Sequence, residues 1–379
     1  MSLEQARSRH LGDAVADSRV LVTTGAGGVG KTTSAAALGY AGARAGRRTL
    51  VLTIDPARRL AQALGIEHLD DEPAQVPVAA PDGGELWAMM LDMQTTFDRL
   101  IDRHATSPDN ARAIKANRIY RTLASTLSGT QEYMAMERLH ELHDTGEWDL
   151  LVIDTPPTRS ALDFLDAPKR MTSFLEGRLL TLLLKPGMIA GRGLGRVVGA
   201  GATAFMRVAG KVTGMELLED LADFFRDFEG MYDGFKQRAE EVLVLLQDPR
   251  SRFVVVTTPE PPPLREARFF LQRLEQEGLH AAGVVVNRIH PLPPPEPDDT
   301  ALRTAAAAGG DDDLARGVTG TLEVLADVRN LAERQRRDVN AALFGVRVHT
   351  VVEVPLLGQD VHDATGLEMI ATTLTTRTA

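Results

Sequence analysis

The segment from Gly25 to Thr33, GAGGVGKTT, constrains this chain more than any other feature of its sequence. It satisfies the pattern G-x-x-x-x-G-K-[ST], in which a glycine-rich backbone turns its N–H groups toward phosphate oxygens. An apolar run, Val20–Thr24, precedes the segment and a helical pattern, Thr33–Ala45, follows it. A glycine-rich turn without a ligand is the alternative, but the pattern and its strand–loop–helix context both predict a phosphate-binding loop.

Each part of this loop predicts a contact with a nucleotide and its magnesium ion. Lys31 is expected to reach the β- and γ-phosphates, and the Thr32 hydroxyl is expected to ligate Mg²⁺. The helix that begins here adds the partial positive charge of its N-terminus. The nucleotide-binding residues predicted within the loop are Gly25, Gly27, Gly28, Val29, Gly30, Lys31, Thr32 and Thr33.

Short β-branched runs alternate with longer helical patterns along the chain. Several of the runs are apolar on consecutive residues, which is typical of strands buried on both faces of a parallel sheet. The alternation predicts an α/β fold with a doubly wound, mostly parallel sheet. The predicted strands are Val20–Thr24, Thr49–Ile54, Leu86–Leu91, Leu150–Ile153, Phe253–Thr257, Ala282–Val286 and Val346–Val352.

Two stretches break this alternation. Residues 168–248 predict a helical insertion subdomain, which divides the α/β core into residues 1–167 and residues 249–379. Residues 290–317 contain PLPPPEP, AAAAGG and DDD, a composition that predicts a disordered surface loop.

The insertion combines basic and apolar segments. Its first part, Pro168–Val212, holds eight basic residues and one acidic residue. Its later part places Leu218, Leu221, Phe225 and Phe228 on one face of a predicted helix, with acids on the other face. Such a stripe could line a groove for a hydrophobic helix, or it could face the subdomain's own core. The sequence leaves both interpretations open.

Composition excludes several classes of protein. The 379-residue chain has 42 basic and 52 acidic residues, a formal net charge of −10, which disfavours a nucleic-acid-binding protein. It has no cysteine, so disulfides, thiolate metal sites and a cysteine nucleophile are excluded.

The apolar runs Leu179–Leu184 and Val197–Met206 are shorter than the ~18–20 residues of a membrane-spanning helix. We therefore expect a cytoplasmic protein that meets a membrane only at its surface.

Two aspartates stand where predicted strands end. Asp154 follows Leu150–Ile153, and Asp55 follows Thr49–Ile54. Ligands of open parallel sheets bind beyond the carboxyl ends of the strands, which would place both acids near the phosphate loop. An aspartate at a strand exit is also a common turn residue. In the functional interpretation, Asp154 holds Mg²⁺ through a water molecule.

Taken in chain order, these motifs resemble those of the arsenite-pump and tail-anchored-protein-targeting ATPase family, dimeric P-loop switch proteins of the nitrogenase-iron-protein type. GAGGVGKTT resembles the family's phosphate loop, and Asp55–Leu60 resembles its first switch. Asp154–Thr158, continuing through Leu162–Pro168, resembles its second switch. The segments that resemble its later strand ends are Val256–Glu260, Val285–Arg288 and Val354–Leu357.

The resemblance implies ATP and Mg²⁺ as ligands and gives roles to residues that would otherwise be ordinary. Asp55 would position the attacking water, Asn287 would recognise adenine, and the loop from Pro355 would pack against the base. The catalytic residues would be Asp55 and Lys31, and the metal-holding residues Thr32 and Asp154. The implied nucleotide-binding residues outside the phosphate loop are Glu260, Arg288, Asn287, Pro355 and Leu356, with contact by Glu260 across a dimer interface as one arrangement.

Three departures from the family's pattern bear on how the chain assembles. The family has a second, signature lysine after the first glycine of the loop, where this chain has Ala26. Its second switch has Thr-Gly-His where this chain has Thr158-Arg159-Ser160. The cysteine pair that clasps zinc between targeting-ATPase subunits is absent. A homodimer with two equivalent sites is therefore in question, and a heterodimer with a lysine-bearing paralogue is the hypothesis that the missing lysine favours.

The leading interpretation is an ATPase that couples its nucleotide state to a protein or membrane partner. In the family, the region of residues 168–248 forms a client-handling or regulatory subdomain, which suggests a hydrophobic-helix client or a membrane component. A regulatory, weakly hydrolysing subunit is the first alternative. A DNA-partitioning ATPase would need a clustered basic face. A metabolic ligase or kinase of the dethiobiotin-synthetase sort would turn over a small carbon substrate and need no protein partner.

Overall fold

The computed structural model describes residues 6–7, 9–55, 59–80, 82–117, 120, 130–155, 232–293, 299–309, 312–358, 361 and 363–376. The predicted insertion therefore lies outside the described residues, apart from its last part from residue 232. The same holds for the segments Thr158–Ser160 and Leu162–Pro168 of the predicted second switch.

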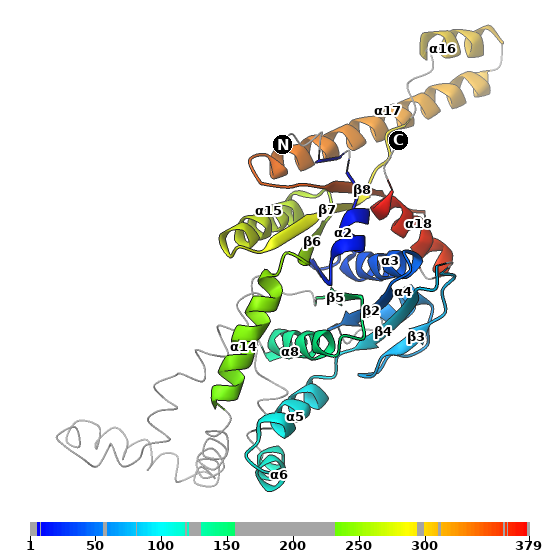
Figure 1. The fold of residues 1–379 in the computed structure, drawn as a ribbon. Coiled ribbons are helices and arrows are strands. Elements are labelled where there is room, and N and C mark those ends of the chain that lie inside the picture. Colours follow the sequence, from blue (N-terminus) through cyan, green and yellow to red (C-terminus); the bar gives the residue numbers. More distant parts are fainter. Residues whose placement is uncertain are drawn as a thin grey trace, which may run out of the picture.

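An eight-stranded sheet in the order β3-β4-β2-β5-β1-β6-β7-β8 forms the centre of the molecule (Figure 1). All neighbouring strands are parallel except β3 and β4, which are antiparallel. The predicted α/β fold with a mostly parallel sheet is confirmed. The strands are β1 Val20–Thr24, β2 Arg48–Thr53, β3 Ala74–Val76, β4 Glu85–Met90, β5 Leu150–Asp154, β6 Ser251–Thr257, β7 His280–Ile289 and β8 Val351–Pro355.

Helices cover both faces of the sheet, and each face has its own apolar core. Alternate residues of a strand point to opposite faces, so Val20 and Val22 join one core and Leu21 joins the other. The first core contains residues of α5 Met93–His104, α6 Pro108–Ala116, α8 Thr130–Asp144, α14 Tyr232–Gln247, α15 Pro261–Gln276 and α17 Asp312–Leu343. The second contains residues of α2 Gly12–Asp17, α3 Lys31–Arg44, α4 Arg59–Leu64 and α18 Ala364–Thr375.

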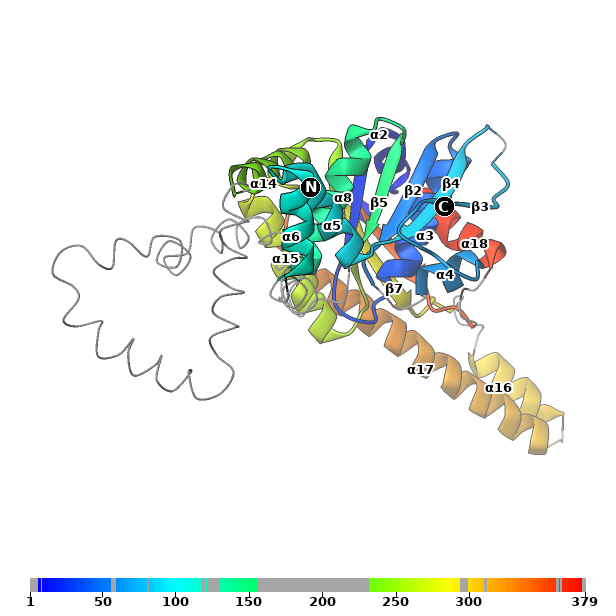
Figure 2. The same cartoon turned by 90° about the horizontal axis from the view of Figure 1, so that it is seen from below.

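The prediction of a disordered loop at residues 290–317 is wrong for the part that the structure describes beyond residue 298. Helix α16, Asp299–Ala308, packs against the beginning of α17. Figure 2 shows this pair of helices extending away from the sheet. Alanine has the highest helix propensity of all residues, which explains why the AAAA run is helical despite its low complexity. The acidic residues Asp312 and Asp313 begin α17, where the N-terminus of a helix favours negative charge.

Most predicted strand ends lie within a few residues of the observed ones, and the largest difference is at the last strand. Strand β8 begins at Val351 and not at Val346, because Val346 and Val348 pack as part of the turn that follows α17. The short edge strand β3 was not predicted, since two of its three side chains are exposed and it has no apolar run.

The described end of the predicted insertion is joined to the core by a buried ion-pair network. Glu137 of α8 has a side chain that is only 3% exposed, and it accepts hydrogen bonds from Arg238 of α14 (2.8 Å) and Arg103 of α5 (3.3 Å). Helix α14 leads directly into β6, the strand beside β1. The network therefore connects the exit of the predicted insertion with two helices of the core. Among the described residues, the structure contains no helix with the length and apolar character needed to cross a membrane.

Candidate functional site

The phosphate loop connects β1 to α3 at the centre of the sheet. Gly25 has φ +151°, and a Cβ there would lie 2.0 Å from the carbonyl oxygen of Val256 in β6. Gly30 is the N-cap of α3 in the left-handed region, φ 97°, and a Cβ there would lie 2.2 Å from the Asn287 amide nitrogen. Both positions favour glycine, Gly25 because a Cβ would collide with the backbone of β6 and Gly30 because its backbone is in the left-handed region.

Lys31 is buried and its ammonium group lies against the inside of the loop. Its Nζ donates hydrogen bonds to the carbonyl oxygens of Gly25 (3.0 Å) and Ala26 (2.8 Å). Burial lowers the pKa of Lys31, while the charges of Asp154 and Asp55 act in the opposite direction. The loop thus holds a cation at the centre of the glycine-rich turn, where the phosphates of a nucleotide would add negative charge.

Asp154 ends β5 and is completely buried. Its Oδ2 accepts a hydrogen bond from the Thr53 hydroxyl (2.9 Å), whereas its Oδ1 has no hydrogen-bond partner among the described residues. Burial raises the pKa of this carboxyl to about 6, against the lowering effect of the Thr32 and Thr53 hydroxyls and of Lys31. A buried carboxylate oxygen without a partner, beside a threonine hydroxyl, is a donor set that suits a hard cation such as Mg²⁺.

Asp55 follows β2, and its side chain faces the same space as the loop. The carboxylate is 12% exposed, and its Oδ2 lies 3.5 Å from a guanidinium nitrogen of Arg59, the first residue of α4. The Asp55 backbone N–H donates to the Thr53 hydroxyl (3.2 Å). The Thr53 hydroxyl therefore contacts both predicted acids, one through its carboxylate and the other through its backbone.

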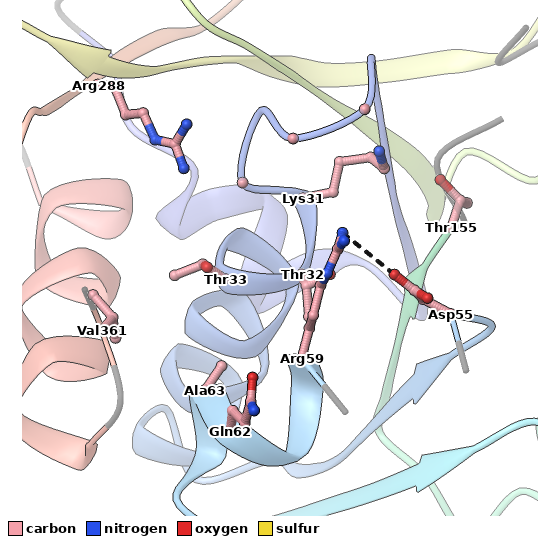
Figure 3. Close-up of a pocket in the computed structure, with 13 residues that line it drawn as sticks. Lys31, Thr32, Thr33, Asp55, Arg59, Gln62, Ala63, Thr155, Arg288 and Val361 are labelled. Carbon is pink, nitrogen blue, oxygen red and sulfur yellow. Dashed lines mark ion pairs between the residues drawn. The ribbon is translucent and has the colours of Figure 1, made fainter. Parts of the chain in front are cut away.

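A cavity of about 470 Å³ lies between the loop, α4 and the ends of β2 and β5. Figure 3 shows Lys31, Thr32 and Asp55 on one side of this cavity and Arg288 on the other side of the loop. The lining residues are Gly27, Gly28, Gly30, Lys31, Thr32, Thr33, Asp55, Arg59, Gln62, Ala63, Thr155, Arg288 and Val361.

Several predicted nucleotide-binding residues do not line the cavity. The Asn287 amide donates to the Val29 carbonyl oxygen (2.9 Å), so it supports the loop from outside, and Gly25 packs against β6. Glu260 is the exposed N-cap residue of α15. Pro355 ends β8, and Leu356 is 45% exposed and bonds through its N–H to Ile289. The predicted roles of these residues remain predictions.

Five lining residues were not predicted as site residues. Arg59 lies inside the segment that resembles the first switch, and its spacing of four residues from Asp55 was a signal for an ion pair. Gln62 and Ala63 follow one turn later in the same helix, and Thr155 follows Asp154 directly. No sequence signal points to Val361, which reaches the cavity from the segment before α18.

Comparison with known proteins identifies a family. The sequence model of the anion-transporting ATPases matches residues 18–305, more than half of the chain. A putative arsenical pump-driving ATPase 1 of Aquifex aeolicus is 24% identical, over 72% of this chain and 64% of its own length. ATPase ARSA2 of Chlamydomonas reinhardtii is 27% identical, over 70% and 66%. An uncharacterized protein of Streptomyces coelicolor, SCO2128, is 31% identical, over 72% and 63%. The matches thus span less than two thirds of the length of these relatives.

The contact between Gly25 and β6 predicts a severe effect of a single methyl group. We expect Gly25→Ala to lower the melting temperature and to abolish the stabilisation of the chain by Mg-ATP, because the added Cβ must displace the Val256 carbonyl. Thermal unfolding with and without Mg-ATP measures both effects. Gly317→Ala in α17, where a Cβ meets open space, is the control and is expected to leave both quantities unchanged or to raise the melting temperature. Nucleotide stabilisation that persists in Gly25→Ala would contradict this view of the loop.

Proposed function

The chain belongs to the anion-transporting ATPase family, and on this basis we propose that it binds Mg-ATP at the phosphate loop and hydrolyses it. The observation that carries the proposal is that Lys31, Thr32 and Asp55 line one cavity, with the buried carboxylate of Asp154 close enough behind them that its charge acts on Lys31. A positioned cation, a metal-side acid and a water-orienting group are the parts that phosphoryl transfer to water needs.

In this proposal the phosphates lie in the glycine-rich turn. Phosphate oxygens there accept the hydrogen bonds that Lys31 now donates to the carbonyl oxygens of Gly25 and Ala26. Thr32 and Asp154 would hold the magnesium ion, Asp154 through a water molecule. The ion, when bound, would supply positive charge to the β- and γ-phosphates. The base extends past Arg288 toward Asn287 and the segment Pro355–Leu356, and Glu260 contacts the nucleotide from the end of β6.

Asp55 orients the attacking water and accepts its hydrogen bond. The water oxygen forms a bond to the γ-phosphorus while the bond from that phosphorus to the bridging oxygen breaks. The electron pair of the broken bond stays with ADP, and one water proton passes by way of the Asp55 carboxylate to the released phosphate. The low exposure of Asp55, 12%, supports this role because a carboxylate shielded from bulk solvent holds a water molecule in one orientation.

We further propose that the ATPase works as a dimeric, cytoplasmic switch whose nucleotide state changes its affinity for a partner. Residues 1–167 and 249–379 form the core in this proposal, and residues 168–248 form a helical subdomain that handles a hydrophobic helix or contacts a membrane surface. With no cysteine in the chain, capture of arsenite by thiols of this chain is not part of the proposal.

The apolar stripe of the helical subdomain provides a test of this output role. We expect Phe225→Asp/Phe228→Asp to abolish binding to an apolar helical peptide or to vesicles of anionic lipid, with ATP hydrolysis and the circular dichroism spectrum retained. Co-sedimentation measures binding. Loss of folding in the double variant would assign the stripe to the subdomain's own core instead.

One observation favours a second candidate function. Ala26 stands where the family resemblance implies a lysine, and its side chain is buried within the loop. A chain without that cation would serve as a regulatory, weakly hydrolysing subunit of a heterodimer with a lysine-bearing paralogue. The two candidates differ in whether the purified chain hydrolyses ATP by itself.

The proposed site predicts different losses for two of its residues. Lys31→Ala is expected to abolish both nucleotide binding and hydrolysis, because it removes the cation that lies against the inside of the turn. Asp55→Asn is expected to retain binding while kcat falls by about 10²-fold or more, because the side chain keeps its shape but no longer accepts a proton. Phosphate release and calorimetric titration with Mg-ATP measure the two quantities. Hydrolysis that is unaffected by Asp55→Asn would support the regulatory subunit.

A further inference from the structure

The absence of a lysine at position 26 raises the question of which other cation can act on the terminal phosphate. Of the described residues that line the cavity, Lys31, Arg59 and Arg288 are cationic. Lys31 occupies the inside of the turn, and a second cation is what hydrolysing P-loop enzymes commonly add to stabilise the charge of the transition state. Arg59 and Arg288 are therefore the two described lining residues that can provide this second cation.

Arg59 lies at the end of the cavity where hydrolysis would take place. Its guanidinium is 3.5 Å from the Asp55 carboxylate, and it is near enough to Lys31 that its charge contributes to the lowered pKa of that lysine. Figure 3 shows the Arg59 side chain rising from α4 toward Asp55, beside Thr32. Arg288 lies on the opposite side of the loop from Asp55 (Figure 3). Arg59 is thus the cation beside the water-orienting group.

The environment of Arg59 leaves its guanidinium available for a phosphate. The side chain is 57% exposed to the cavity and the solvent, and it belongs to the first residue of a short helix. A guanidinium presents five N–H donors in a planar fork, so it can donate hydrogen bonds to a carboxylate and to a phosphate oxygen at the same time. The ion pair with Asp55 also keeps the arginine directed toward the cavity before a nucleotide arrives.

We propose that Arg59 is a catalytic residue of this site and that its guanidinium, from the same chain as the phosphate loop, stabilises the charge that develops on the terminal phosphoryl group. This inference rests on the proposed ATP hydrolysis and deepens it. The bonds made and broken are those of the hydrolysis described above, and Arg59 neither gives nor takes a proton. The chain consequently needs no lysine at position 26 and none from a partner.

Steady-state kinetics of the full-length chain with Mg-ATP test the role of Arg59. Arg59→Ala is expected to lower kcat on the order of 10²- to 10³-fold with little change in KM, and Arg59→Lys is expected to restore part of the loss. The matched control is Arg44→Ala, which removes an arginine that pairs with Glu368 (3.0 Å) at the opposite end of α3. That control is expected to keep the kcat of the unaltered chain.

A transition-state analogue separates this role from folding and from nucleotide binding. Arg59→Ala is expected to bind ADP as the unaltered chain does, but to lose affinity for ADP with aluminium fluoride by at least about tenfold. Equal affinity for the analogue in both chains would overturn the assignment. So would an unaltered chain that binds Mg-ATP without hydrolysing it, since Arg59 would then not replace the missing lysine.

Mixing two inactive variants shows which chain supplies the arginine. Asp55→Asn and Arg59→Ala each lack one group, and no single chain in the mixture has both, so no activity is expected to return. Recovery of activity on mixing would show that Arg59 acts across a dimer interface and would overturn the assignment to the same chain.

If Lys31→Ala leaves hydrolysis unchanged, the proposed function itself fails, whatever the result for Arg59.

Discussion

The parallel pairing of β5 with both β1 and β2 is the constraint on which the site depends. In this register Asp154 lies opposite Thr23 of β1 and Thr53 of β2, at the carboxyl ends of all three strands. The phosphate loop leaves β1 at this edge, and Asp55 follows β2. A shift of one residue in either pairing would turn Asp154 to the other face of the sheet and away from the Thr53 hydroxyl. The strand register therefore places the buried carboxylate of Asp154 at the edge of the sheet where the phosphate loop begins.

The same sheet also explains how the site and the described end of the insertion are connected. Val256 of β6 lies against Gly25 of the phosphate loop, and α14 precedes β6 by a short turn. Glu137 then joins α14 to α8 and α5 through Arg238 and Arg103. Removing one partner of this pair would leave the buried Glu137 carboxylate uncompensated, which is costly.

Most of the fold could be predicted from the sequence because buried parallel strands leave long apolar runs, such as Val20–Thr24 and Leu150–Ile153. The phosphate loop was recognisable because its glycines are set by the backbone, which has positive φ at Gly25 and Gly30. The sequence did not predict the helices α16 and α17. Clusters of proline, alanine and aspartate have the composition of a disordered segment, and composition does not show which of these residues lie within a helix. The position of Arg59 in the cavity could not be derived from its own sequence position, because it depends on where α4 packs against α3.

Binding of Mg-ATP where the phosphate loop and the ends of β2 and β5 meet is open to a direct measurement. Hydrogen exchange of the full chain, followed by mass spectrometry with and without Mg-ATP, locates the segments that the nucleotide protects. We expect slower exchange in peptides that cover residues 25–33, 53–64 and 150–155, with no such change in the edge strand β3. Slower exchange confined to other segments, or none at saturating Mg-ATP, would contradict it.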